Sequence, residues 1–97
     1  MDIDWEPPAG NNVANYGLLI DNLYTALSPS HKLITAAVNP WTNEIPAAAV
    51  NAKMDWLNVM CYDFAPANHS TFDDAKSGME DWSTYGVSKS KLLMGVP

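Results

Sequence analysis

Three acidic side chains stand at every second position near the start of the sequence: Asp2, Asp4 and Glu6, with apolar residues between them. In a β-strand all three carboxyl groups lie on one face, because successive side chains point to opposite faces. Each carboxylate makes its neighbour harder to ionise, which helps a carboxylic acid to stay protonated for general acid catalysis. The alternative is that these acids are the solvated face of an edge strand and have no chemical role.

The elements that must position these acids follow from hydrophobic patterning. Apolar, partly β-branched runs predict strands, and apolar residues at helical spacing predict helices. The expected strands span 1–6, 33–38, 56–62 and 91–96, and the expected helices span 12–27, 46–50 and 72–85. This alternation predicts an α/β fold with a parallel sheet and right-handed crossovers.

Two architectures fit this alternation, an open doubly wound sheet and a segment of a (β/α)₈ barrel. No Gly-rich phosphate loop follows any expected strand, which disfavours the nucleotide-binding form of the open sheet. Pro7 and Pro8 follow Glu6 and are expected to end the first strand. Glu6 would then stand at the carboxyl end of that strand, where barrel enzymes keep their catalytic groups.

Two motifs together resemble glycoside hydrolase family 18, the chitinases. Asp-x-Asp-x-Glu with Trp5 before the Glu is similar to the end of Asp-Gly-x-Asp-x-Asp-x-Glu on the family's fourth barrel strand, and Met60-Cys61-Tyr62-Asp63 to Met-x-Tyr-Asp on the sixth. Gly95-Val96-Pro97 is similar to the end of the seventh strand. The signature's first Asp and its Gly would precede Met1, so the resemblance implies that residues 1–97 are an incomplete catalytic domain of barrel strands four to seven.

The resemblance implies roles for the three acids in retaining hydrolysis assisted by the substrate's own acetamido group. Glu6 is the expected acid, and later the base that activates water. Asp4 is expected to orient the acetamido N–H and to favour a protonated Glu6, and Asp2 to share a proton with Asp4. Trp5 is expected to pack in the core rather than to touch the ligand.

Further site residues are expected at the ends of the second and third strands. By resemblance, Tyr62 donates its hydroxyl to the acetamido oxygen, Asp63 holds the same sugar, and Met60 packs beneath it. Trp41 and Phe64 lie in loops expected to face the cleft, where sugars stack on flat rings. Both are therefore candidates for substrate contact.

Composition limits the partners. The net charge is −6, arginine is absent, and the five lysines are scattered, which argues against nucleic acid and anionic membranes. No segment is long enough to span a membrane. Cys61 is the single cysteine, so neither an internal disulfide nor a cysteine metal cluster is expected, and neither a cofactor nor a metal is implied.

The predicted function is hydrolysis of chitin, the β-1,4-linked polymer of N-acetylglucosamine, by a secreted parent protein. The alternatives are an endo-β-N-acetylglucosaminidase acting on glycans or peptidoglycan, and a non-catalytic chitin-binding lectin of the same fold. The intact Glu6 argues against the lectin, because such lectins typically have the acid replaced. We expect the isolated chain to be inactive, and either to self-associate through open sheet edges or to be poorly stable.

Overall fold

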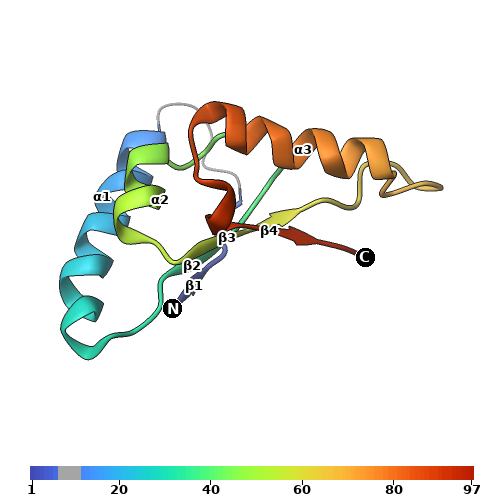
Figure 1. The fold of residues 1–97 in the computed structure, drawn as a ribbon. Coiled ribbons are helices and arrows are strands. Elements are labelled where there is room, and N and C mark those ends of the chain that lie inside the picture. Colours follow the sequence, from blue (N-terminus) through green and yellow to red (C-terminus); the bar gives the residue numbers. More distant parts are fainter. Residues whose placement is uncertain (7–11) are drawn as a thin grey trace.

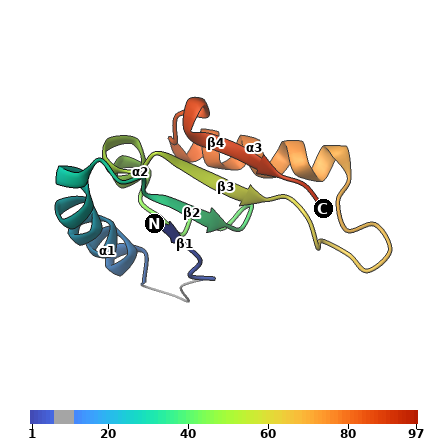
Figure 2. The same ribbon diagram turned by 90° about the horizontal axis from the view of Figure 1, so that it is seen from below.

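A computed structural model of the chain describes residues 1–6 and 12–97 and shows one parallel sheet with its helices on one side (Figures 1 and 2). The strands lie side by side in chain order: β1 (Asp2–Ile3), β2 (Thr35–Val38), β3 (Trp56–Met60) and β4 (Leu92–Gly95). The helices are α1 (Asn12–Leu27), α2 (Ala47–Lys53) and α3 (Phe72–Tyr85), with short 3₁₀ turns η1 (Ser28–Ser30) and η2 (Lys89–Lys91). The predicted α/β fold with parallel strands is confirmed.

The core lies between the sheet and the helices. In the ladder Ile3 is level with Ala36, Ala36 with Leu57, and Leu57 with Leu92, so this apolar row shares one face of the sheet. Helix side chains cover that face and are fully buried; they include Tyr16, Ile20, Val50 and Trp82. The polar residues of the strands are thereby left on the opposite face.

The strands are shorter than the sequence predicts. Only Asp2 and Ile3 of the first segment pair with β2, yet side chains still alternate beyond the ladder, with Ile3 buried and Asp4 exposed. Trp5 stacks on Tyr16 of α1 with ring centroids 5.2 Å apart, which confirms that Trp5 is a packing residue. The strand-ending role predicted for Pro7 and Pro8 lies outside the described residues.

Helix α3 matches its predicted range and both of its ends have a physical cause. The Thr71 hydroxyl caps the start by accepting the backbone N–H of Asp74 at 3.1 Å. Gly86 ends the helix at a φ of 116°, which favours glycine. A Cβ at Gly78 would lie 2.6 Å from the Cβ of Pro40, so α3 packs closely on the turn after β2 because residue 78 has no side chain.

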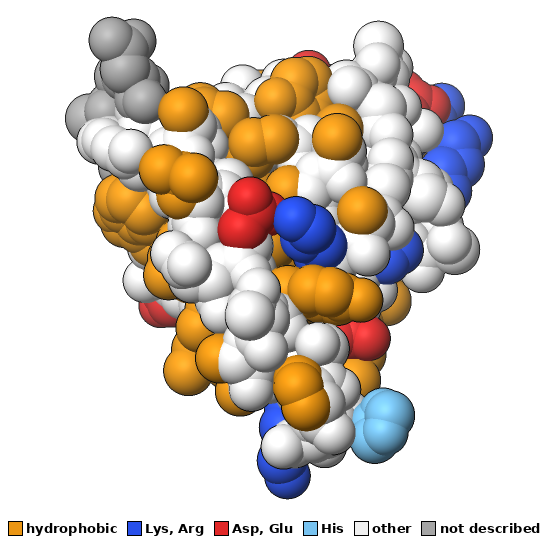
Figure 3. Space-filling view, turned by 90° about the vertical axis from the view of Figure 1, so that its left-hand side faces the viewer, with side chains coloured by type: hydrophobic (Ala, Val, Ile, Leu, Met, Phe, Trp, Pro, Cys, Tyr) orange, Lys and Arg blue, Asp and Glu red, His pale blue; other side chains and the backbone are white. Residues whose placement is uncertain are grey.

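Helices α1 and α2 form the side of the molecule shown in Figure 3, where hydrophobic side chains lie among a few charged ones. An ion pair of 2.5 Å joins Lys53 of α2 to Asp21 of α1. At the edge of the sheet formed by β4, three apolar residues are exposed: Leu93 and Met94 in the strand and Val96 after it. No helix among the described residues is long and apolar enough to cross a membrane.

Candidate active site

The carboxyl ends of β1, β2 and β3 open into a hollow of about 750 Å³. Each of the three strands, with the residues that directly follow it, contributes two lining residues. The two are two positions apart and therefore lie on the same face of the sheet: Asp4 and Glu6, Ala37 and Asn39, and Met60 and Tyr62. The loops after β2 and β3 add Pro40, Trp41, Thr42, Asp63 and Phe64. Seven of the eight predicted site residues therefore lie around one hollow, and only Asp2 lies outside it.

Asp4 and Glu6 form the acidic wall of the hollow. A hydrogen bond to the Asp4 carboxyl raises the pKa of Glu6, and partial desolvation and the negative charge of Asp4 raise it further. Ionisation of Glu6 next to the negative charge of Asp4 is therefore unfavourable. Glu6 is therefore better able than an ordinary glutamate to carry a proton that it can donate.

Asp2 has a different partner from the predicted one. Its Oδ1 accepts the hydroxyl of the buried Thr35 at 2.6 Å, and the ladder pairs the same two residues. No hydrogen bond joins Asp2 to Asp4 in the described structure. The bond to Thr35 fastens β1 to β2 below the hollow, and a proton shared between Asp2 and Asp4 stays a prediction.

Tyr62 enters the hollow from the end of β3, and its ring lies against Gly95 of the neighbouring strand. A Cβ built on Gly95 would be 3.1 Å from Cε1 of Tyr62 and 3.0 Å from the carbonyl oxygen of Val59. A side chain at residue 95 would therefore push the phenol or the strand out of place. The missing side chain is what allows the phenol to lie along β4.

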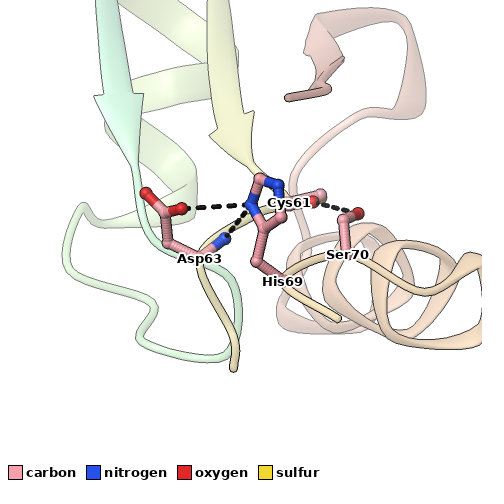
Figure 4. A network of polar contacts seen from close by, with 4 residues as sticks. All are labelled: Cys61, Asp63, His69 and Ser70. Atoms are coloured by element: carbon pink, nitrogen blue, oxygen red, sulfur yellow. Dashed lines mark hydrogen bonds and ion pairs between the residues drawn. The ribbon is translucent and has the colours of Figure 1, made fainter. Parts of the chain in front are cut away.

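The loop after β3 holds Asp63 in a left-handed conformation, with a φ of 61°. His69 Nδ1 lies 3.3 Å from the backbone nitrogen of Asp63 and 3.1 Å from its Oδ1 (Figure 4), and the tautomer of His69 decides which of the two contacts is a hydrogen bond. The loop is closed further by Phe64 N–H donating to the carbonyl of His69 and by the Ser70 hydroxyl donating to the carbonyl of Cys61. Nothing in the spacing of His69 along the sequence indicates that the chain folds back on Asp63.

An aromatic pair forms the aromatic wall of the hollow. The rings of Trp41 and Phe64 lie 5.0 Å apart at 47°, although they come from different loops. The indole N–H of Trp41 donates to the Ser77 hydroxyl of α3 at 3.1 Å, which fixes the ring direction. Trp41 is 45% exposed and so presents an apolar surface to the hollow.

A carboxyl group that sequence reasoning missed lies behind the hollow. Glu44 follows β2 and is only 2% exposed, and it accepts the backbone N–H of Asn39 at 3.0 Å. Burial is the main cause that raises the pKa of Glu44, and the charge of Glu6 adds to it. Glu44 belongs to neither motif, so only its burial in the folded chain distinguishes it.

The described residues contain no group of three or more His, Cys, Asp or Glu side chains that could hold a metal ion. Cys61 is fully buried, its thiol lies 3.7 Å from the carbonyl oxygen of Ala75, and burial raises the pKa of the thiol. Cys61 is therefore a packing residue at the end of β3 rather than a reactive one.

Comparison with known sequences gives a match over the whole chain. The model for the family described as glycosyl hydrolases family 18 matches residues 1–97. A class V chitinase from Medicago truncatula is 30% identical over 130 residues, which cover 99% of this chain and 33% of that protein. A class V chitinase from Arabidopsis thaliana is 27% identical over 125 residues, which cover 100% of this chain and 32% of that protein. The chain thus spans about a third of the length of these relatives.

Solved structures give the same picture. The chitinase-like agglutinin of Robinia pseudoacacia superposes with a TM-score of 0.83 at 28% identity, over 99% of this chain and 37% of that one. A family GH18 chitinase from Cycas revoluta, solved in complex with allosamidin, gives the same TM-score and identity, over 99% of this chain and 36% of that one. The fold of the chain is therefore that of part of a (β/α)₈ barrel of this family.

Proposed function

Because this chain belongs to glycosyl hydrolases family 18, we propose that the protein of which it forms the acid-bearing part hydrolyses chitin with retention of configuration. The observation that carries the proposal is the hollow itself, where Asp4, Glu6 and Tyr62 converge from two separate strands. The class V chitinases among the relatives, and the allosamidin complex of the Cycas revoluta chitinase, support chitin as the substrate class.

In the proposed first step the acid Glu6 gives its proton to the glycosidic oxygen, and the bond from that oxygen to the anomeric carbon breaks. The acetamido oxygen of the same sugar attacks that carbon from the opposite face and forms a ring. Asp4 accepts the acetamido N–H, and the Tyr62 hydroxyl donates to the acetamido oxygen to hold it in line. In the second step Glu6 takes a proton from water, which adds to the anomeric carbon and reopens the ring, so the configuration is retained.

The remaining lining residues are proposed to bind the sugar. Asp63, which contacts His69, is proposed to hold the sugar bound by Tyr62, and Met60 to pack beneath it. Trp41 and Phe64 offer ring faces to the apolar faces of neighbouring sugars. The protein is proposed to be secreted, because a polymeric substrate does not enter cells.

The proposal is tested by incubating the full-length protein with chitin hexasaccharide and following the products and their anomers. We expect shorter oligosaccharides released as β-anomers, and inhibition by allosamidin. Release of sugar only from N-glycans or peptidoglycan would instead identify an endo-β-N-acetylglucosaminidase. Binding of the hexasaccharide without any product would identify a lectin. The similarity to the Robinia pseudoacacia agglutinin supports this second candidate.

The isolated 97-residue chain is proposed to be an incomplete catalytic domain, covering barrel strands four to seven. In the described structure the outer edges of β1 and β4 have no strand partner, and Leu93 and Val96 are exposed beside one of them. We expect the purified chain to elute as oligomers in size-exclusion chromatography, or to unfold readily, and to leave a chromogenic chitobioside intact. Turnover of that substrate by the chain, abolished by Glu6→Gln, would contradict this expectation.

A further inference from the structure

Glu44 is the one charged side chain in the described part of the chain that is fully buried, and neither motif accounts for it. Its Oε1 accepts the backbone N–H of Asn39 at 3.0 Å. Its Oε2 is also buried and has no hydrogen-bond partner among the described residues. Burial of a carboxyl group is unfavourable, so a residue kept in this state calls for a role that a smaller apolar side chain cannot fill.

The bond from Asn39 to Glu44 closes the loop that carries Trp41. Within this loop Trp41 and Asn43 have left-handed φ values of 61° and 48°, and a bulky tryptophan rarely adopts this conformation. The other side of the loop base is fixed at the Asn39 carbonyl, which accepts the Thr42 hydroxyl at 3.0 Å and the indole N–H of Trp82 at 2.9 Å. Glu44 thus completes the set of bonds that holds an unfavourable loop shape beside the hollow.

Glu44 also lies within electrostatic reach of the proposed acid. Besides burial, the charge of Glu6 at the end of β1 raises the pKa of Glu44, while the N–H of Asn39 lowers it. From α1, the Tyr16 hydroxyl faces the same region; its pKa is raised by burial and then by the charges of Glu44, Asp4 and Asp2. Burial is thus the main reason why the charged form of Glu44 is unfavourable, and the neighbouring acid adds to it.

We propose that Glu44 is a positioning residue of this site: its buried carboxyl fixes the loop that carries Trp41 and so holds the indole at the hollow. This inference rests on the proposed function, because it assigns Glu44 a part in the same hydrolysis. Glu44 does not line the hollow, so it acts on substrate only through Asn39 and Trp41.

Two substitutions in the full-length protein test the hydrogen bond that closes the loop. Glu44→Ala removes the acceptor for the Asn39 N–H, and we expect KM for chitin hexasaccharide to rise about tenfold with a smaller change in kcat. Glu44→Gln keeps an acceptor oxygen, so we expect it to restore KM close to the wild-type value. Glu80→Gln, on the exposed face of α3, is the matched control and should leave KM unchanged. A wild-type KM in Glu44→Ala, or a KM in Glu44→Gln that rises as much as in Glu44→Ala, would overturn the proposal.

A measurement without substrate separates this inference from the proposed function. The pKa of Glu44 is raised in the folded protein, so its contribution to stability is fully present below the pKa of the unfolded chain and is lost as pH rises through the folded pKa. Glu44→Gln does not titrate, so its Tm should exceed that of wild type more at about pH 7 than at about pH 4. An equal difference at both pH values overturns the buried-carboxyl assignment, whereas the expected difference in a protein that cleaves no chitin oligosaccharide contradicts the proposed function alone.

Discussion

Replacing Glu6 with glutamine is expected to lower kcat for chitin hexasaccharide by about 10³-fold or more, because the amide keeps the shape of the acid but has no proton to give. Binding should survive, since the aromatic wall, Asp63 and Met60 are untouched. The measurement is kcat by product release and Kd by calorimetry on the same preparations of the full-length protein. Wild-type rates in Glu6→Gln would dismiss Glu6 as the acid.

The control for this experiment is Glu80→Gln, which makes the same chemical change on the solvent-exposed side of α3. It should leave both kcat and Kd unchanged. If both constants changed in Glu6→Gln, the loss of rate would reflect a disturbed hollow instead of a missing proton. The prediction therefore requires kcat to fall in Glu6→Gln while Kd stays unchanged.

Replacing Asp4 with asparagine should lower kcat/KM about 10²-fold and move its alkaline limb to lower pH. The hydrogen bond to Asp4 is the largest cause that raises the pKa of Glu6, and the charge of Asp4 adds to it. Asparagine removes that charge, so the pKa of Glu6 falls towards its ordinary value and the acid loses its proton earlier as pH rises. The measurement is a pH–rate profile of the full-length protein.

Asp73→Asn provides the matched control, because Asp73 is exposed in the first turn of α3 and away from the hollow. Its pH–rate profile should coincide with that of wild type. An unaltered profile in Asp4→Asn would refute the coupling between Asp4 and Glu6, even if the rate were lower. A moved profile with an unchanged rate would refute the role of Asp4 in orienting the substrate.

The sequence was sufficient for the two long helices and for the meeting of the two motifs, whereas α2 runs from Ala47 to Lys53 and so extends beyond its predicted range of 46–50. Both α1 and α3 match their predicted ranges, because the 3.6-residue period extends over several turns and Gly86 marks a stop. The acids and Tyr62 come together because parallel strands end at the same edge of a sheet. The strands were predicted too long, because the length of a strand depends on the hydrogen bonds that its neighbouring strand offers. The Ile34 N–H, for example, donates to the Asp55 carboxylate instead of to a carbonyl of the neighbouring strand.

What the sequence could not supply is the loop geometry. Left-handed φ values at Trp41, Asn43 and Asp63 bring Glu44 back to Asn39 and His69 back to Asp63. These residues are not glycine, so composition gives no sign that the chain turns there. The positioning residues of the hollow therefore emerge only from the folded chain, whereas the residues proposed to react are visible in the motifs.

The contact between Gly95 and Tyr62 has a consequence for how this cleft can diversify. Two of the smallest residues lie on the strands that flank β3: Ala37 on β2 and Gly95 on β4. Of the two, only Ala37 lines the hollow. Growth by a methyl group or two at Ala37 would narrow the space open to a ligand and leave the phenol where it is. The same growth at Gly95 would strike the phenol and the Val59 carbonyl. The size of the ligand accepted by the hollow can therefore change through substitutions at Ala37 of β2. Residue 95 of β4 must instead stay glycine for Tyr62 to keep its position.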